Sequence, residues 1–333
     1  MKIVQLGSLG LAVSAEGLGC MGMSTTYGPA DERESLVTLA RAVELGVTLF
    51  DTAEVYGPFS NEILLGKAFH GKRDKVVIAT KVGFQFTNAG KLAMVDGQPV
   101  VTGKPDDVRS AVEGSLGRLR TDYIDLLYLH RIDPTTRIEE TIGVLAQLVR
   151  EGKVRFIGVS EASALTIRKA HATHPLTAVQ SEYSLFERGV ETNEVLATVR
   201  KLGIGFVSYS PLGRGLLAGK LKSLDELDAT DFRRSDPRFQ SEHLAANISL
   251  IGRITAIAQA KGVKPSQLAI AWTIQFGTVP IPGTRRVKFL EDNITAADIT
   301  LTDDELKMLD VAIPIGAASG NRYSVGMMRT LER

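Results

Sequence analysis

Short apolar runs alternate with amphipathic stretches along most of the chain, and this alternation constrains the fold more than any other feature. Apolar, β-branched runs of about four to eight residues are typical of strands buried on both faces. The intervening stretches repeat apolar residues every three or four positions, as amphipathic helices do. The strands predicted in this way are 16–20, 48–51, 76–81, 123–130, 154–160, 177–181, 205–209 and 279–282. The predicted helices are 31–45, 61–69, 105–119, 138–150, 164–171, 191–202 and 265–276.

Strands that alternate with helices predict a parallel sheet, and eight such units would close a (β/α)₈ TIM barrel. A barrel of this kind needs about 250 residues, so one domain covering residues 1–333 has room for additional segments. We expect an N-terminal β-hairpin from 3–5 and 11–13, an extra polar loop at 220–243 after the seventh strand, and a C-terminal tail after Ile313. The alternative is an open, doubly wound sheet, which would bind a dinucleotide after its first strand.

Two glycine-rich segments imitate phosphate-binding motifs. Residues 17–22 match the letters of the GxGxxG fingerprint, but 23–29 separate them from the next helical pattern. A dinucleotide fingerprint needs its helix to begin at the glycines, so we interpret 17–22 as a tight turn after a strand. Residues 215–220 resemble a P-loop but are one residue short and are followed by Leu221, so they form no Walker motif.

Charge and cysteine content exclude several classes of protein. Lysine plus arginine (39) nearly equals aspartate plus glutamate (38), so no basic field would attract nucleic acid or acidic membranes. No apolar run approaches the roughly 20 residues of a membrane helix, and the first ten residues lack the apolar core of a secretion signal. Cys20 is the only cysteine, and no Cys/His cluster suggests a metal site. We expect a cytoplasmic enzyme or an enzyme-like binder; the sequence leaves its oligomeric state open.

Consecutive predicted strands end on ionisable side chains. Asp51, Lys81 and His130 each follow an apolar run directly, and Tyr56 lies in the loop after Asp51. In a barrel these strand ends meet on the catalytic face. Taken singly, Asp51 could cap a helix, and a lysine or histidine at a strand end is usually solvated or structural.

The four side chains together suit one kind of chemistry. A free phenol and a free lysine have pKa values of about 10 and 10.4, so neither is poised for proton transfer at neutral pH. A lysinium beside Tyr56 would lower the pKa of the phenol, and a buried Asp51 carboxylate would keep Lys81 charged and oriented. His130 could donate a hydrogen bond to a substrate oxygen. The group therefore suits protonation of a carbonyl oxygen while the carbon is reduced.

These residues, together with the stretch 46–66 and several motifs in the C-terminal half, resemble the aldo-keto reductases, a superfamily of (β/α)₈ barrels that bind NADPH without a Rossmann fold. The resemblance covers nearly the whole chain. The form Ser-Pro-Leu-Gly-Arg-Gly at 210–215, followed by a long loop, is similar to the branch that contains pyridoxal and perakine reductases and potassium-channel β-subunits. The other motifs are Gly-Val-Ser at 158–160, Gln180, Tyr209 and Ile-Pro-Gly-Thr at 281–284.

The resemblance implies a role for each residue. Tyr56 would donate the proton, and Lys81 and Asp51 would adjust the pKa of its hydroxyl. His130 would orient the carbonyl. The implied cofactor is NADPH or NADP⁺, with Tyr209 stacked on the nicotinamide and its carboxamide bound by Ser160 and Gln180. The loop over the pyrophosphate would comprise Ser210, Pro211, Leu212, Gly213, Arg214 and Gly215. The adenosine and its 2′-phosphate would be surrounded by Gly283, Thr284, Arg285, Asp292 and Asn293.

Two positions depart from the family pattern. Glu161 follows Ser160 where relatives often have asparagine, and a carboxylate can accept from the carboxamide nitrogen but cannot donate to its oxygen. Phe289 stands where many relatives carry arginine, which leaves more of the phosphate recognition to Arg285. The segment 283–288 supplies the guanidinium, hydroxyl and helix-start amides that a 2′-phosphate needs, although a solvated basic turn has the same composition.

The substrate pocket is expected to be lined by the loops after strands 1, 3, 4 and 7. Aromatic and methionine side chains in these loops suit a moderately large apolar carbonyl compound, although the same residues could simply pack the loops. Arg131, beside His130, could attract an anionic group or pair with Asp133. The candidate lining residues are Met23, Tyr27, Phe84, Phe86, Arg131, Asp133 and either Phe232 or Phe239.

The expected reaction is the NADPH-dependent reduction of an aldehyde or ketone to an alcohol. One alternative is a Schiff-base lyase or aldolase that uses Lys81 as the nucleophile, which Asp51 and Tyr56 beside that lysine disfavour. Another is a cofactor-sensing regulatory subunit with vestigial reductase activity, which the intact set of four residues disfavours. The small-molecule carbonyl compound is the only partner that the sequence indicates.

Overall fold

The computed structural model describes residues 1–24 and 26–332, and these residues form a parallel eight-stranded sheet whose strands pair in chain order. The strands confirm the predicted runs to within two residues at every end. They are β3 (Leu18–Gly19), β4 (Leu49–Asp51), β5 (Val77–Val82), β8 (Ile124–Leu129), β9 (Val154–Ser160), β10 (Ala178–Glu182), β11 (Gly205–Tyr209) and β12 (Val279–Pro280). The (β/α)₈ prediction is therefore confirmed.

The barrel closes where the first strand meets the last. Gly19 forms a parallel bridge with Gly283, and the Gly17 amide donates to the Pro280 carbonyl at 2.9 Å. A Cβ atom at Gly19 would lie 2.7 Å from the Ile281 carbonyl oxygen, a distance that a side chain cannot adopt. The glycines that imitate a dinucleotide fingerprint thus allow the closing strands to approach each other, and the next long helix begins only at Glu32.

Helices surround the barrel, and their bounds agree closely with the predicted stretches. The helix expected at 191–202 is confirmed over 195–202 but does not run back to 191, because Glu194 adopts a left-handed φ of 65° and separates two helices. Arg188 binds the Glu191 carboxylate at 2.8 Å and fixes the shorter of them. The helices that follow strands are α1 (Glu32–Glu44), α2 (Ser60–Ala68), α3 (Pro105–Leu119), α4 (Ile138–Arg150), α5 (Ala164–Thr173), α6 (Gly189–Thr192), α7 (Val195–Leu202), α9 (Pro265–Gln275) and α10 (Val287–Ile294).

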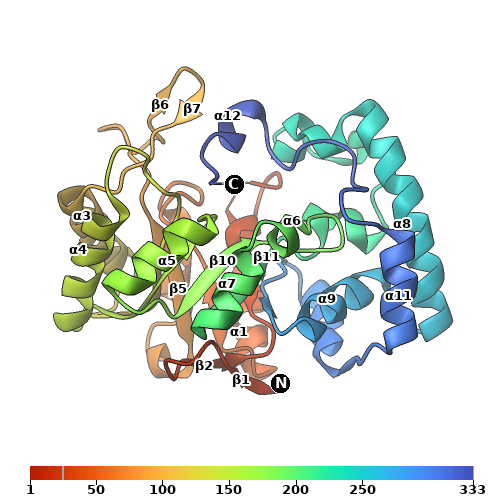
Figure 1. Cartoon of the computed structure of the whole chain (residues 1–333), viewed down its shortest axis with the longest axis horizontal. Helices are drawn as coiled ribbons and strands as arrows, with labels where there is room; N and C mark the ends of the chain where they lie inside the picture. Colours follow the sequence, from red (N-terminus) through yellow and green to blue (C-terminus); the bar gives the residue numbers. More distant parts are fainter. Residues whose placement is uncertain (25, 333) are drawn as a thin grey trace.

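The predicted N-terminal hairpin is present as β1 (Ile3–Gln5) and β2 (Ala12–Ser14), which pair antiparallel. Leu6, Leu11 and Val13 of this hairpin pack with Tyr128 and Val207 inside the barrel. The hairpin lies beneath the strands, at the end opposite to α12 (Val325–Met328) in the tail (Figure 1). It therefore seals the lower end of the barrel with apolar side chains and leaves the upper end for a site.

The additional segments contain more regular structure than the sequence predicts. The polar loop runs through short 3₁₀ turns at 224–226, 232–235 and 237–239 into a long helix, α8 (Ser241–Lys261). In Figure 1, α8 lies beside α11 (Asp303–Ala312) at the outer edge of the molecule. A small hairpin, β6 (Met94–Val95) and β7 (Gln98–Pro99), rises near the tail, and Gly326 of α12 lies close to the backbone of Gly97. Among the described residues, no helix combines the length and apolarity needed to cross a membrane.

Candidate active site

Lys81 lies at the centre of a buried polar cluster at the upper end of the barrel. Its side chain is 1% exposed, and its Nζ donates to the Asp51 carboxylate, to the Thr52 carbonyl at 2.8 Å and to the Tyr56 hydroxyl at 3.1 Å. An ammonium has three N–H donors, so these acceptors satisfy it. The strand ends and the loop after β4 thus bring Asp51, Tyr56 and Lys81 into contact.

Gln180 extends this cluster from β10. Its Nε2 donates to the second carboxylate oxygen of Asp51 at 2.8 Å. The resemblance to the family assigns Gln180 to a nicotinamide carboxamide, and the structure gives its amide nitrogen this additional partner. Gln180 therefore holds the carboxylate that in turn holds Lys81.

The protonation states differ in one respect from those expected. Burial raises the pKa of Tyr56 and outweighs the expected lowering by Lys81, which is present, so the net pKa is raised. Burial lowers the pKa of Lys81, but Asp51 and Tyr56 outweigh it and the net pKa is raised. Lys81 is therefore charged and Tyr56 protonated at neutral pH, so that the phenol holds a proton that it can donate.

His130 follows β8 and stands beside the phenol. Its ring meets the Tyr56 ring edge-on, with centroids 6.0 Å apart, and the Phe84 ring at 5.0 Å. Burial, with the nearby charges of Arg131 and Lys81, lowers the pKa of His130 well below its usual value. The imidazole is therefore neutral, and a neutral imidazole can donate a hydrogen bond without placing a second positive charge beside Lys81.

A cavity of about 800 Å³ opens above this cluster. Asp51, Tyr56 and His130 line it, whereas Lys81 lies behind them. Most of the residues expected to bind a cofactor also line it: Ser160, Gln180, Tyr209, Ser210, Pro211, Leu212, Arg214, Gly215, Gly283, Thr284 and Arg285. The cavity thus connects the polar cluster with the loops after β11 and β12.

Some of the expected site residues do not reach the cavity. Gly213 and Asn293 are absent from its lining, and Asp292 forms an ion pair with Lys264. Asn293 is 5% exposed and lies within α10. Lys264 draws the Asp292 carboxylate towards the start of α9.

The candidate substrate residues divide in the same way. Tyr27, Phe84, Arg131 and Phe232 line the cavity. The expectations for the other candidates are corrected: Met23 and Phe239 pack in the core, Phe86 stacks on Phe59 with centroids 4.5 Å apart, and Asp133 binds the Gly103 amide and nearby threonines.

The loops after the first and seventh strands meet across the mouth of the cavity. Tyr27 contacts Phe232 edge-on, with ring centroids 5.1 Å apart, and the Phe232 amide donates to the Thr26 carbonyl at 3.2 Å. Arg233 pairs with Asp231 at 2.6 Å, and its guanidinium lies 4.9 Å from the centre of the Tyr27 ring. These contacts hold the extra loop over the cavity.

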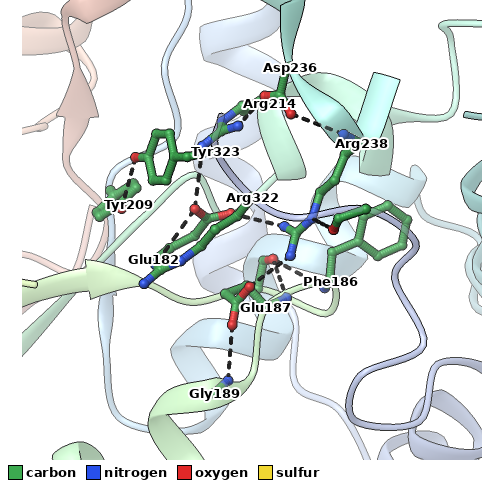
Figure 2. Close-up of polar contacts among 12 residues, drawn as sticks. Glu182, Phe186, Glu187, Gly189, Tyr209, Arg214, Asp236, Arg238, Arg322 and Tyr323 are labelled. Atoms are coloured by element: carbon green, nitrogen blue, oxygen red, sulfur yellow. Dashed lines mark hydrogen bonds and ion pairs between the residues drawn. The ribbon is translucent and has the colours of Figure 1, made fainter. Parts of the chain in front are cut away.

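The C-terminal tail supplies residues that the sequence did not indicate. Figure 2 shows Arg322 and Tyr323 reaching from the tail towards Tyr209, Glu182 and Arg214. The Tyr323 hydroxyl lies 3.0 Å from that of Tyr209, and the Arg214 guanidinium lies 4.3 Å from the centre of the Tyr323 ring. An arginine and a tyrosine after Gly320 follow no strand and no recognisable motif, so no local signal points to this role.

Glu161 is the point at which the tail meets the barrel. Both of its carboxylate oxygens accept from Arg322, at 2.9 and 2.6 Å, and Oε1 also accepts from the Tyr209 hydroxyl at 2.8 Å and from the Glu182 amide at 2.9 Å. Burial raises the pKa of Glu161, but Arg322, together with Arg131 and the Glu182 amide, outweighs burial and the net pKa is lowered. The Glu161 carboxylate is therefore occupied by these hydrogen bonds, one of which holds the Tyr209 hydroxyl in place.

Arg214 is likewise held by carboxylates. Its guanidinium pairs with Asp236 from the extra loop and lies 3.5 Å from Glu182 (Figure 2). Arg238 binds Glu182 at 3.2 Å and Glu187 at 2.7 Å. The network connects the extra loop, the end of β10 and the loop after β11, and so fixes the wall of the cavity.

Cationic side chains gather at the far end of the cavity. Arg285 Nη1 donates to the Pro29 carbonyl at 2.6 Å. Lys220 and Arg286 lie 4.5 and 5.7 Å from the centre of the Phe289 ring, which lines the cavity at the start of α10. This end of the cavity therefore carries positive charge at a helix start, where phosphate groups bind well.

Comparisons with known proteins agree with this arrangement. The model of the Aldo/keto reductase family matches residues 17–314. Probable aldo-keto reductase 1 from Glycine max is 44% identical over 328 residues, which cover 97% of this chain and 92% of that protein. The glycerol dehydrogenase AKR11B4 from Gluconobacter oxydans has a similar structure, with a TM-score of 0.83 and 26% identity over 97% of this chain and 98% of that one. A thermostable aldo-keto reductase, Tm1743, solved with the inhibitor epalrestat, gives a TM-score of 0.73 and 29% identity over 94% of this chain and 100% of that one. The chain therefore belongs to the aldo/keto reductase family.

Proposed function

We propose that this oxidoreductase reduces an aldehyde or ketone to an alcohol with NADPH, and that Tyr56 donates the proton. The observation that carries the proposal is the buried Lys81 ammonium, held by Asp51 and 3.1 Å from the Tyr56 hydroxyl at the base of an 800 Å³ cavity. This arrangement places a proton donor and a fixed positive charge where a carbonyl oxygen can approach.

The residues around the cavity fit a nicotinamide dinucleotide. Tyr209 offers an aromatic face near the polar cluster, and Ser160 offers a hydroxyl beside it. The cations at the far end, Arg285 and Arg286, suit phosphate groups, and Thr284 adds a hydroxyl. NADPH bound there would supply the hydride.

The proton transfer follows from the positions of the side chains. His130 and the Tyr56 hydroxyl would both donate hydrogen bonds to the carbonyl oxygen, which orients the substrate and polarises the C=O bond. As negative charge develops on that oxygen, the phenolic O–H bond breaks and the proton passes to the substrate. Lys81 stabilises the resulting phenolate, and Asp51 keeps Lys81 in place. A proton from solvent then restores the phenol.

The test replaces Tyr56 by phenylalanine, which removes the proton and keeps the ring. We expect kcat for a carbonyl substrate to fall about 10²- to 10⁴-fold, while the Kd for NADPH, measured by fluorescence titration, changes less than about twofold. Tyr123→Phe is the matched control, because Tyr123 packs under Arg73 and Arg155 away from the cavity. Turnover retained by Tyr56→Phe would exclude the role of proton donor.

A panel of aldehydes and ketones, run with NADPH and with NADH, separates the alternatives. A regulatory subunit would bind the nucleotide tightly and turn over none of the panel efficiently. A Schiff-base enzyme would give a borohydride-trapped adduct on Lys81. The 1% exposure of Lys81 and its hydrogen bonds to Asp51, Thr52 and Tyr56 argue against that chemistry.

A further inference from the structure

Arg131 is a buried cation. Among the described residues, no carboxylate oxygen lies within 4 Å of its guanidinium nitrogens. It directly follows His130, is 4% exposed and lines the cavity. Its Nη1 donates to the His130 carbonyl at 2.7 Å and to the Ser160 hydroxyl at 3.3 Å, which are both neutral acceptors. Asp133, the ion-pair partner that the sequence offered, instead accepts from Gly103 and from nearby threonines.

The other arginines deep in the cavity wall are compensated differently. Arg214 pairs with Asp236, and Arg233 pairs with Asp231. A buried charge without a counter-ion is strongly unfavourable, so the difference at Arg131 calls for an explanation. The carboxylate whose charge acts on Arg131 is that of Glu161, and Arg322 already binds both of its oxygens.

The donors of Arg131 that remain free are directed in part at the cavity. Nε is fully enclosed and has no hydrogen-bond partner among the described residues. Nη2 also has no partner in the described part of the chain, but it is not enclosed, and the residue lines the cavity. A ligand in the cavity can therefore reach Nη2 beside the imidazole that would orient the carbonyl.

We propose that Arg131 forms a subsite for an oxyanion of the substrate, a carboxylate or a phosphate, so that the preferred carbonyl compounds are anionic. This inference rests on the proposed reductase function. The oxyanion would neutralise the charge of the guanidinium and accept a charge-assisted hydrogen bond from Nη2. Phe84, which lines the cavity and whose ring lies 5.0 Å from that of His130, would contact the apolar body of the same substrate.

The experiment compares matched substrates that differ in charge. The carboxylate pair is 3-formylbenzoate and its neutral methyl ester, and the phosphate pair is glyceraldehyde 3-phosphate and glyceraldehyde. We expect the wild-type protein to have a kcat/KM at least tenfold higher for the anionic member of one pair, and that pair identifies the oxyanion. No preference for the anion in either pair would overturn the proposal.

Arg131→Met removes the charge and keeps the length of the side chain, and Arg131→Lys keeps the charge. We expect Arg131→Met to lower kcat/KM for the anionic substrate roughly 10- to 150-fold and for the neutral one less than threefold, with part of the preference kept by Arg131→Lys. An equal loss for both substrates would show that Arg131 only supports Ser160 and the cofactor, and would overturn the subsite. Should Arg131→Met fail to fold, the wild-type preference and Arg131→Lys still decide.

A binding measurement separates this inference from the proposed function. Calorimetry with the product-like 3-(hydroxymethyl)benzoate requires no turnover, and its Kd should rise at least tenfold in Arg131→Met. If no carbonyl compound is reduced but this loss of affinity is observed, the subsite stands and the reductase proposal fails. If the Kd is the same in both proteins, the carboxylate subsite is rejected whatever the turnover.

Discussion

Replacing Lys81 by methionine should destabilise the protein as well as inactivate it. Asp51 is 3% exposed and would keep only the Gln180 amide as a hydrogen-bond donor among the described side chains. Removing one partner of a buried ion pair typically costs about 3–5 kcal/mol, because the remaining charge stays buried without compensation. For a chain of 333 residues, with an unfolding entropy of about 2.1 cal/mol/K per residue, this corresponds to a decrease in Tm of about 4–7 °C.

A second variant isolates the cause. In Asp51→Leu/Lys81→Met both charges are gone, and apolar side chains of similar size fill the space, which is often neutral for stability. The Gln180 amide then loses its acceptor, at a cost of about 1–3 kcal/mol, so recovery relative to Lys81→Met should be partial. Both variants should be inactive, because neither retains the cation beside Tyr56.

Urea unfolding, followed by the fluorescence of Trp272, measures these differences. Trp272 is the single tryptophan and is fully buried, so its emission should report the loss of the core. A Lys81→Met protein as stable as the wild type would refute the argument, since Asp51 would then not depend on the ion pair. A double variant no more stable than Lys81→Met would contradict it as well, since removing the unpaired carboxylate should return more stability than the unpaired Gln180 amide costs.

Two further predictions concern the ends of the cavity. Arg285→Ala should raise the Kd for NADPH more than that for NADH, by roughly 10-fold or more, because its guanidinium lies at the end suited to a 2′-phosphate; fluorescence titration checks this, and equal effects would exclude that contact. Arg322→Ala should raise the Kd for NADPH several-fold and increase chymotryptic cleavage in the tail, because Glu161 and Tyr209 lose their support. Arg329→Ala, which changes an exposed arginine of the same tail, should alter neither quantity, and an Arg322→Ala protein that behaves like it would contradict the inferred support.

The strands could be predicted well from the sequence because burial on both faces produces continuous apolar runs. The runs 154–160 and 205–209 agree with β9 and β11 at both ends. The sequence did not predict the long helix α8. A polar residue on its buried face partly explains why the apolar periodicity of this helix is weak. Asn247 is fully buried and binds the Arg238 carbonyl and the backbone of Ser319, so it occupies a position where an apolar residue would have marked the helix.

The central cluster could be predicted because a barrel brings successive strand ends together. Asp51, Lys81 and His130 end consecutive predicted strands, and the topology alone makes them neighbours. The partners of Tyr209 could not be found in this way. Arg322 and Tyr323 lie more than a hundred residues away in sequence, and no periodicity or motif in the tail indicates where they contact the barrel.

Glu161 and Arg322 are best understood as a pair. Without Arg322, a glutamate at position 161 would bury an uncompensated negative charge beside Tyr209. Its backbone has a φ of 55°, which residues other than glycine rarely adopt. Two hydrogen bonds from Arg322 compensate that charge, and they also anchor the tail over the barrel. Because the anchored tail then places Tyr323 against Tyr209, the same contacts that neutralise the carboxylate shape the cavity wall. The departure from the family pattern at 161 therefore makes the C-terminal tail a part of the site, and a substitution at either position should affect the other.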